Sequence, residues 1–124
     1  MANIRHVVVI RRDLNLSPGL MAAQVAHIND AWLRFKVQNG GEYSVDQAEW
    51  CEAPYLSVLA VDNYEELNAI IGDANSNKLD VHTWRDLIPS KNLKCNLENV
   101  LIGCSIGPHD FDAIKAVTGN LPLA

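Results

Sequence analysis

The sequence predicts one α/β domain in which a largely parallel sheet is covered by helices on both faces. Apolar, β-branched runs alternate with segments of helical periodicity, as in strand–helix–strand units. The chain has 124 residues, enough for one hydrophobic core and too few for two. Its 48% hydrophobic and 20% charged residues are typical of a globular protein. We therefore expect a single domain over residues 1–124.

The first strand is predicted over residues 4–10, a β-branched run typical of a strand buried on both faces. The charged residues Arg11, Arg12 and Asp13 close it. The apolar run is too short for a signal peptide or a membrane-spanning helix. We therefore expect a cytoplasmic protein with no membrane partner.

One long helix is predicted next, because Ser17 followed by Pro18 is a helix-start signal and a glycine pair at 40–41 is a stop signal. Apolar residues recur at steps of three and four, and three alanines form a second face, so we expect packing on two sides. A polar connection should then run to about Pro54. The apolar face consists of Met21, Val25, Ile28, Trp32 and Phe35, and the small face of Ala22, Ala23 and Ala26.

Three further strands are predicted over residues 55–61, 79–84 and 98–106. A helix capped by Asp62 or Asn63 should run to Ile71, with a loop over 72–78, and a last helix should span 110–117. We expect the four strands to share one sheet with the helix from Ser17 packed against it.

Composition restricts the function. The net charge of −5 argues against strong non-specific binding to nucleic acid, so any contact with RNA must be local. The three cysteines form no CxxC motif and the four histidines have no metal-ligand spacing. Motifs of nucleotide-binding loops, zinc proteases and serine hydrolases are absent. We expect neither a metal nor a cofactor.

The most specific motif lies in the N-terminal quarter, where residues 8–14, 16–19 and 22–27 read VVIRRDL, LSPG and AAQVAH. This block resembles the opening of type 2 peptidyl-tRNA hydrolases. Weaker similarities follow at residues 49–51, Asp86, 106–108 and 117–119. The resemblance implies a three-layer α/β/α fold around a four-stranded mixed sheet. It also implies a homodimer that cleaves the ester joining a peptide to its tRNA.

Two departures from the family pattern stand out. A Gly-Lys step precedes the Ala-Ala-Gln of the family, whereas this chain has Gly19 followed by Leu20. The family segment Asp-Ala-Gly-Arg-Thr-Gln is replaced here by DLIPSK from Asp86 to Lys91. Family positions between Lys91 and Gly107 cannot be transferred, because this segment is longer than usual.

The resemblance implies that Asp86 holds the attacking water, that Ser90 is its hydrogen-bonding neighbour, and that Gln24 faces the site. Leu20, one helical turn before Gln24, then occupies the place of the missing lysine. Substrate contacts are expected from the helix start at Ser17 and Gly19, whose backbone N–H groups suit a phosphate, and from Leu20 and Arg11.

Each of these residues has a structural alternative. An aspartate after a strand is commonly a turn former, and Arg11 is compatible with a solvated strand end. Gln24 is equally suited to satisfying a backbone group, and His27 on an alanine-rich helix favours packing over catalysis.

Three functions remain open from the sequence. The first is a hydrolase of peptidyl-tRNA or a related ester, weakened because losing one oxyanion donor typically costs about 10²–10³ in rate. The second is a catalytically inactive module that binds a ligand, an RNA end or a protein. The third is a small-molecule hydrolase or transferase that reuses the same pocket. A positive groove beside Gln24 and Asp86 would favour the first.

Overall fold

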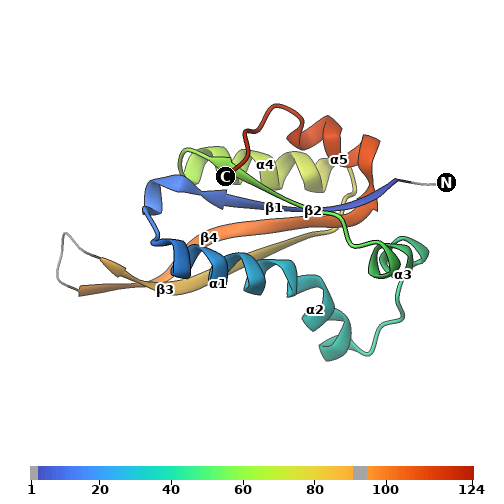
Figure 1. The fold of residues 1–124 in the computed structure, drawn as a ribbon, viewed down its shortest axis with the longest axis horizontal. Coiled ribbons are helices and arrows are strands. Elements are labelled where there is room, and N and C mark those ends of the chain that lie inside the picture. Colours follow the sequence, from blue (N-terminus) through green and yellow to red (C-terminus); the bar gives the residue numbers. More distant parts are fainter. Residues whose placement is uncertain (1–2, 91–94) are drawn as a thin grey trace.

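The computed structural model describes residues 3–90 and 95–124, in which helices cover both faces of one four-stranded mixed sheet (Figure 1). Helices α1, α2 and α3 lie on one face and α4 and α5 on the other. The elements are β1 (Ile4–Arg11), the 3-10 turn η1 (Arg12–Leu14), α1 (Pro18–Asn29), α2 (Ala31–Asn39), α3 (Val45–Glu52), β2 (Leu56–Val61), α4 (Tyr64–Ser76), β3 (Val81–Ser90), β4 (Cys95–Asp110) and α5 (Phe111–Thr118).

The strand order is β2-β1-β4-β3, which confirms one mixed sheet and corrects the expectation of a largely parallel one. Only β1 and β2 are parallel, whereas β4 runs antiparallel to both β1 and β3. The reason is the connection between β3 and β4. Only four residues, 91–94, separate these strands, and a parallel pair needs a crossover of a dozen or more.

Alternation along β1 divides the core between the two faces. Val8 and Ile10 pack with Ile28 of α1, while Val7 and Val9 pack on the opposite face, against α4 and α5. All four valine and isoleucine side chains of this run are buried, as the unbroken apolar pattern predicts for a strand covered on both sides.

The predicted long helix is two helices, because the chain bends at Asp30 between α1 and α2. Asn29 and Asp30 are poor helix formers, whose side chains compete for backbone hydrogen bonds. The predicted stop is confirmed, since Gly40 caps α2 in the left-handed conformation, with φ of 64°.

The predicted polar connection to Pro54 contains a helix, α3, that the sequence analysis missed. Ser44 and Gln47 form a capping box: Ser44 Oγ accepts from the Gln47 N–H at 3.1 Å, and the Ser44 N–H donates to Gln47 Oε1 at 2.9 Å. This Ser-x-x-Gln spacing was a readable start signal. Two elements were also predicted to end too early. Helix α4 continues to Ser76, and strand β3 continues to Ser90.

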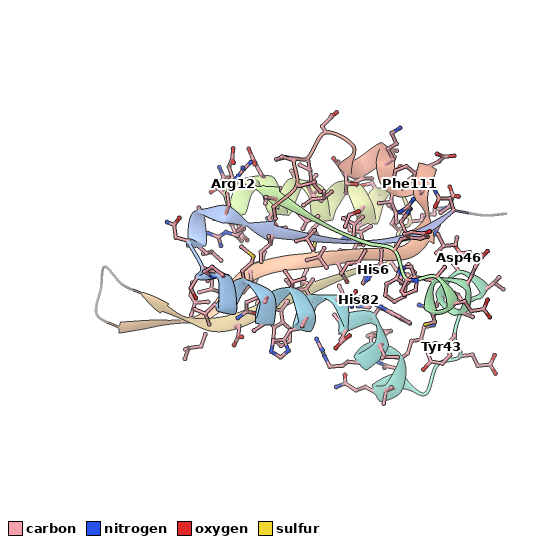
Figure 2. All side chains as sticks on the ribbon, in the orientation of Figure 1. His6, Arg12, Tyr43, Asp46, His82 and Phe111 are labelled. Carbon is pink, nitrogen blue, oxygen red and sulfur yellow. The ribbon has the colours of Figure 1, made fainter. Side chains whose placement is uncertain are left out.

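Helix α3 covers a small aromatic cluster that contains a buried histidine. His6 of β1 is labelled in Figure 2. Its ring lies edge-on to Trp32 of α2 and Trp50 of α3, with ring centroids 6.5 and 5.3 Å away. His6 Nδ1 donates to Asn29 Oδ1 at 2.8 Å, and Nε2 is buried with no partner among the described residues. Burial lowers the pKa of His6 to about 4, because this site cannot solvate an imidazolium.

Acidification should therefore destabilise the fold through His6. The unfolded chain binds a proton below the ordinary pKa of 6.5, whereas the folded chain does so only near 4. The contribution of neutral His6 to stability is fully present above pH 6.5. The free energy of unfolding should fall by about 3 kcal/mol as the pH drops to 4. Urea unfolding at a series of pH values measures this loss.

The matched control is His6→Gln, which keeps a polar partner for Asn29 and does not titrate. Its free energy of unfolding should depend less on pH between 6.5 and 4 than that of the wild type. Equal pH dependences in the two proteins would rule out His6 as the source.

Candidate active site

Strand β3 presents a row of chemically diverse side chains to helices α1 and α2. Alternate residues of a strand share a face, so His82, Trp84, Asp86 and Ile88 point the same way. Contacts confirm this, because Trp84 and Ile88 pack in the cluster around Ile28 of α1. Asp86 therefore lies within β3, which runs from Val81 to Ser90. The sequence had placed it after a strand predicted to end at residue 84.

Gln24 of α1 joins two members of this row. Its Nε2 donates to Asp86 Oδ2 at 3.0 Å, and its Oε1 accepts from Trp84 Nε1 at 2.6 Å. An indole N–H can only donate, so the amide oxygen must face Trp84 and the amide nitrogen must face the carboxylate. Gln24 is 5% exposed, and this pairing, not a backbone group, satisfies its side chain.

Asp86 is held at both carboxylate oxygens. Oδ2 accepts from Gln24, and Oδ1 accepts from the backbone N–H of Leu87 at 2.7 Å. Each oxygen of an ionised carboxylate has two acceptor positions. One position on each therefore remains for a further donor, and the half-buried side chain keeps contact with solvent.

Trp84 is fixed in place by groups from both helices. The exposed ring of His27 stacks on it with 5.0 Å between centroids and 20° between planes. The Arg34 guanidinium lies 5.1 Å from the indole centroid and donates to the His27 carbonyl at 2.6 Å. The packing role expected for His27 is thus seen, whereas the roles of Trp84 and Arg34 were not predicted from the sequence.

The start of α1 lies about two turns before Gln24, and Leu20 lies one turn before it. Ser17 Oγ caps the helix, accepting from the Leu20 N–H at 3.4 Å. Gly19 is exposed, and no atom lies within 4 Å of the position that its Cβ would take. Leu20 is 38% exposed, so an aliphatic side chain faces solvent on the turn adjoining Gln24.

The structure does not bring Arg11 to these residues. Arg11 follows Val7 and Val9 on the α4 face of β1, where its guanidinium lies 5.8 Å from the Tyr64 ring centroid. It pairs with Asp13 at 2.8 Å and donates to the Leu101 carbonyl at 3.1 Å. Grouping Arg11 with Gln24 was wrong, because alternation along β1 turns it to the other face.

Ser90 is the last residue of β3 and pairs in register with Cys95 of β4. Its side chain lies outside the described part of the structure, as does Lys91. The expected contact between Ser90 and Asp86 therefore stays a prediction.

Comparison with known proteins adds to this geometry. A family model described as Peptidyl-tRNA hydrolase PTH2 matches residues 4–124. The chain belongs to this family. A protein of Methanopyrus kandleri named peptidyl-tRNA hydrolase is 36% identical over 122 residues, covering 96% of this chain and 97% of its own length. One of Methanocaldococcus jannaschii with the same name is 35% identical, covering 97% and 99%.

A human relative, named peptidyl-tRNA hydrolase 2, mitochondrial, is 31% identical over 117 residues. The alignment covers 94% of this chain and 62% of the human protein, so the chain corresponds to part of that relative's length. The family resemblance inferred from the opening block is thus confirmed over nearly the whole chain.

This family member has a groove between α2 and the first four residues of β3, which we call the α2–β3 groove. The groove reaches Trp84, two residues before Asp86 along the strand. Its volume is about 460 Å³. A second hollow of about 360 Å³ adjoins it and shares Phe35, Val81 and His82 with it. The groove is lined by Ala31, Arg34, Phe35 and Gln38 of α2 and by Val81, His82, Thr83 and Trp84 of β3.

The α2–β3 groove carries positive charge in an acidic chain. In the described residues, neither Arg34 nor Lys36 takes part in an ion pair with a carboxylate. Burial, the largest cause, lowers the pKa of His82, so its imidazole is neutral at pH 7. Arg34 therefore supplies the positive charge of the groove, since Lys36 lines the adjoining hollow together with the acidic Asp80.

Two observations concern metals and membranes. Over residues 3–90 and 95–124, no three His, Cys, Asp or Glu side chains cluster closely enough to hold a metal ion. No helix in these ranges has the length and hydrophobicity required to cross a membrane.

The bond between Trp84 and Gln24 should contribute measurably to stability. Trp84→Phe leaves Gln24 Oε1 buried without its donor, and Gln24→Leu leaves the indole N–H without its acceptor. Each should lower the free energy of unfolding by about 1–3 kcal/mol, measured by urea denaturation.

The double variant is the control for this interaction. When both partners are apolar, neither buried group is left unpaired, so the combined loss should be smaller than the sum of the two single losses. Strictly additive losses would show that the two side chains are energetically independent.

Proposed function

We propose that this protein hydrolyses the ester bond of peptidyl-tRNA with a water bound by Asp86. The pairing of Gln24 with Asp86 is the observation that carries this proposal, because it holds a half-buried carboxylate in place on the side of β3 that faces α1. Membership of the peptidyl-tRNA hydrolase PTH2 family supports the substrate. We also infer that the 124 residues act as one domain, since the family match spans residues 4–124.

The proposed chemistry uses the free acceptor positions of Asp86. A water donating to one of them has its oxygen lone pair directed away from the carboxylate and toward the ester carbon. As the C–O bond forms, the proton passes to Asp86, which acts as a general base. When the tetrahedral intermediate collapses, the ester C–O bond to the tRNA breaks, and Asp86 returns the proton to the departing ribose oxygen. Gln24 is a positioning residue in this scheme: it holds Oδ2, and Trp84 in turn holds Gln24.

Attack converts the ester carbonyl into an oxyanion, which needs donors aimed at it. In the first turn of α1, Pro18 has no N–H and the Leu20 and Met21 N–H groups bond to Ser17, so the Gly19 N–H is the free backbone donor, and it lies in the partial positive charge of the helix start. We propose that Ser17, Gly19 and Leu20 border the substrate there and that Ser90 hydrogen-bonds near Asp86. Leu20 contributes no charge, so oxyanion stabilisation is weaker than a lysine would provide.

Substitution of Leu20 and Asp86 tests the proposal. Leu20→Lys should raise the rate of peptidyl-tRNA hydrolysis by up to about 10²-fold, because it adds one charged donor at the helix start. Asp86→Asn should abolish the activity, since an amide cannot accept the proton of the water. The measurement is release of free peptide from purified peptidyl-tRNA.

Leu56→Lys is the matched control. Leu56 is 39% exposed against 38% for Leu20, and it lies on β2, at the opposite edge of the sheet from β3. It adds the same charge and should not raise the rate. If both variants fold, Leu20→Lys does not raise the rate of hydrolysis and Asp86→Asn does not lower it, then the proposal of a hydrolase is wrong. A catalytically inactive binding module would then be the better interpretation.

We propose that the protein is a homodimer and works in the cytoplasm, where translation produces peptidyl-tRNA. Trp32 of the apolar helix face does not support a dimer, because it is 3% exposed and covered by α3. The support now comes from apolar side chains that one chain leaves uncovered, Val37 at 72% and Val45 at 82% exposed, with the exposed alanine face of α1.

Light scattering at micromolar concentration should therefore give twice the mass of one chain. Val45→Asp should shift the protein toward monomer without unfolding it, because the side chain makes few contacts within the chain. A monomeric wild type would contradict the dimer.

A further inference from the structure

The α2–β3 groove lies directly beside the proposed site of ester cleavage. Trp84 lines the groove, and Asp86 follows two residues later on the same face of β3, a separation of about 7 Å along the strand. Whatever part of the substrate adjoins the ester on this side must therefore enter the groove. The candidates are the peptide and the 3′ end of the tRNA.

The chemistry of the groove distinguishes between them. Arg34 is preorganised by its contact with the Trp84 ring and by its bond to the His27 carbonyl, and one such bond leaves most of its five N–H donors available. A guanidinium held this way, with no carboxylate paired to it in the described residues, suits a phosphate.

Flat rings line the same groove. Phe35 is 52% exposed and contacts the ring of His82 with centroids 5.3 Å apart, so one aromatic face borders open space. Rings beside cations are how proteins bind single-stranded nucleic acid, because every base offers a face for stacking. The hydroxyl of Thr83 and the amide of Gln38 add polar groups that can hydrogen-bond a base edge.

The chemistry of the proposed substrate also favours its RNA part over its peptide part as the occupant of the groove. Nascent peptides differ in sequence and charge, whereas every tRNA ends in the same three nucleotides, CCA. A subsite built from fixed side chains can recognise only the part that does not vary. The net charge of −5 makes a broad contact with the tRNA body unfavourable, which leaves a short end as the element that local cations can hold.

We infer that the α2–β3 groove binds the single-stranded 3′ CCA end of tRNA, with Arg34 on a phosphate and Phe35 stacked on a base. This inference rests on the proposed function for the identity of the substrate. It assigns Arg34 and Phe35 to binding and not to the chemical step. Their loss should raise KM far more than it lowers kcat, because Phe35 does not contact the proposed chemical site and Arg34 reaches it only through the Trp84 ring.

The test uses RNA without an ester, so that binding is measured apart from hydrolysis. The probe is a hairpin with the acceptor-stem sequence and a 3′ CCA end, compared with the same hairpin lacking CCA, by fluorescence anisotropy. Wild type should prefer the CCA hairpin. Arg34→Gln and Phe35→Ala should each weaken that preference about tenfold, and Arg34→Gln should lower the salt dependence by about one phosphate contact.

Two variants control for charge and folding. Arg12→Gln removes the same charge from the end of β1, where Arg12 bonds Asp62 at 2.6 Å, and should leave binding unchanged. Arg34→Lys keeps the charge and should restore most of the affinity. Equal affinities for Arg34→Gln and Arg12→Gln would overturn the inference.

Other outcomes separate the inference from the proposed function. If the CCA end binds through Arg34 but no peptide is released from peptidyl-tRNA, the proposed hydrolase activity is wrong and the inferred RNA subsite is supported. If release depends on Asp86 while Arg34→Gln behaves as wild type, the subsite fails alone. Displacement of the hairpin by an extended peptide would assign the groove to the peptide. Loss of dimer mass in Phe35→Ala would assign it to a second copy, and either result overturns the inference.

Discussion

The close approach of α1 to the sheet is the constraint on which the site depends. Gly103 of β4 makes this possible, because a Cβ there would lie 3.0 Å from Ile28 Cδ1 and 2.3 Å from the Val9 carbonyl oxygen. Gly103 pairs in register with Trp84, and Gln24 lies one turn before Ile28. The contact that seats the helix thus also brings its amide to the indole, and a side chain at position 103 would force the two apart.

Much of the fold could be predicted from local signals. The first strand, its burial on both faces and the start of α1 at Ser17 followed from β-branched residues and capping chemistry, which act over a few neighbours. The expectation of a largely parallel sheet, drawn from the alternation of strands and helices, was wrong because strand direction depends on long-range pairing, whereas the mixed sheet implied by the family resemblance was confirmed. Helix α3 was missed although Ser44 and Gln47 have the spacing of a capping box. The segment was interpreted as a polar connection, and this helix-start signal was overlooked.

Two residues of the candidate site could be named from the sequence, but their contact could not. The family resemblance pointed to Gln24 and Asp86, but no spacing shows that a residue of α1 and one of β3 are 3.0 Å apart. Trp84 and Arg34 were missed because the sequence does not show which residues of α2 lie opposite which residues of β3. That depends on how the helix is placed on the sheet. Arg11 failed for the same reason, since which face it joins depends on the alternation of β1.

The two edges of the sheet differ in their exposure to other chains. The C-terminal residues lie along β2, where the Ala124 N–H donates to the Val58 carbonyl and Leu123 bridges to Leu59. Strand β3, by contrast, pairs only with β4 within residues 3–90 and 95–124, so its outer backbone groups could template aggregation. The exposed Arg85 on this strand is the kind of charge that discourages such pairing. Neutralising that residue would therefore affect solubility before it affected folding.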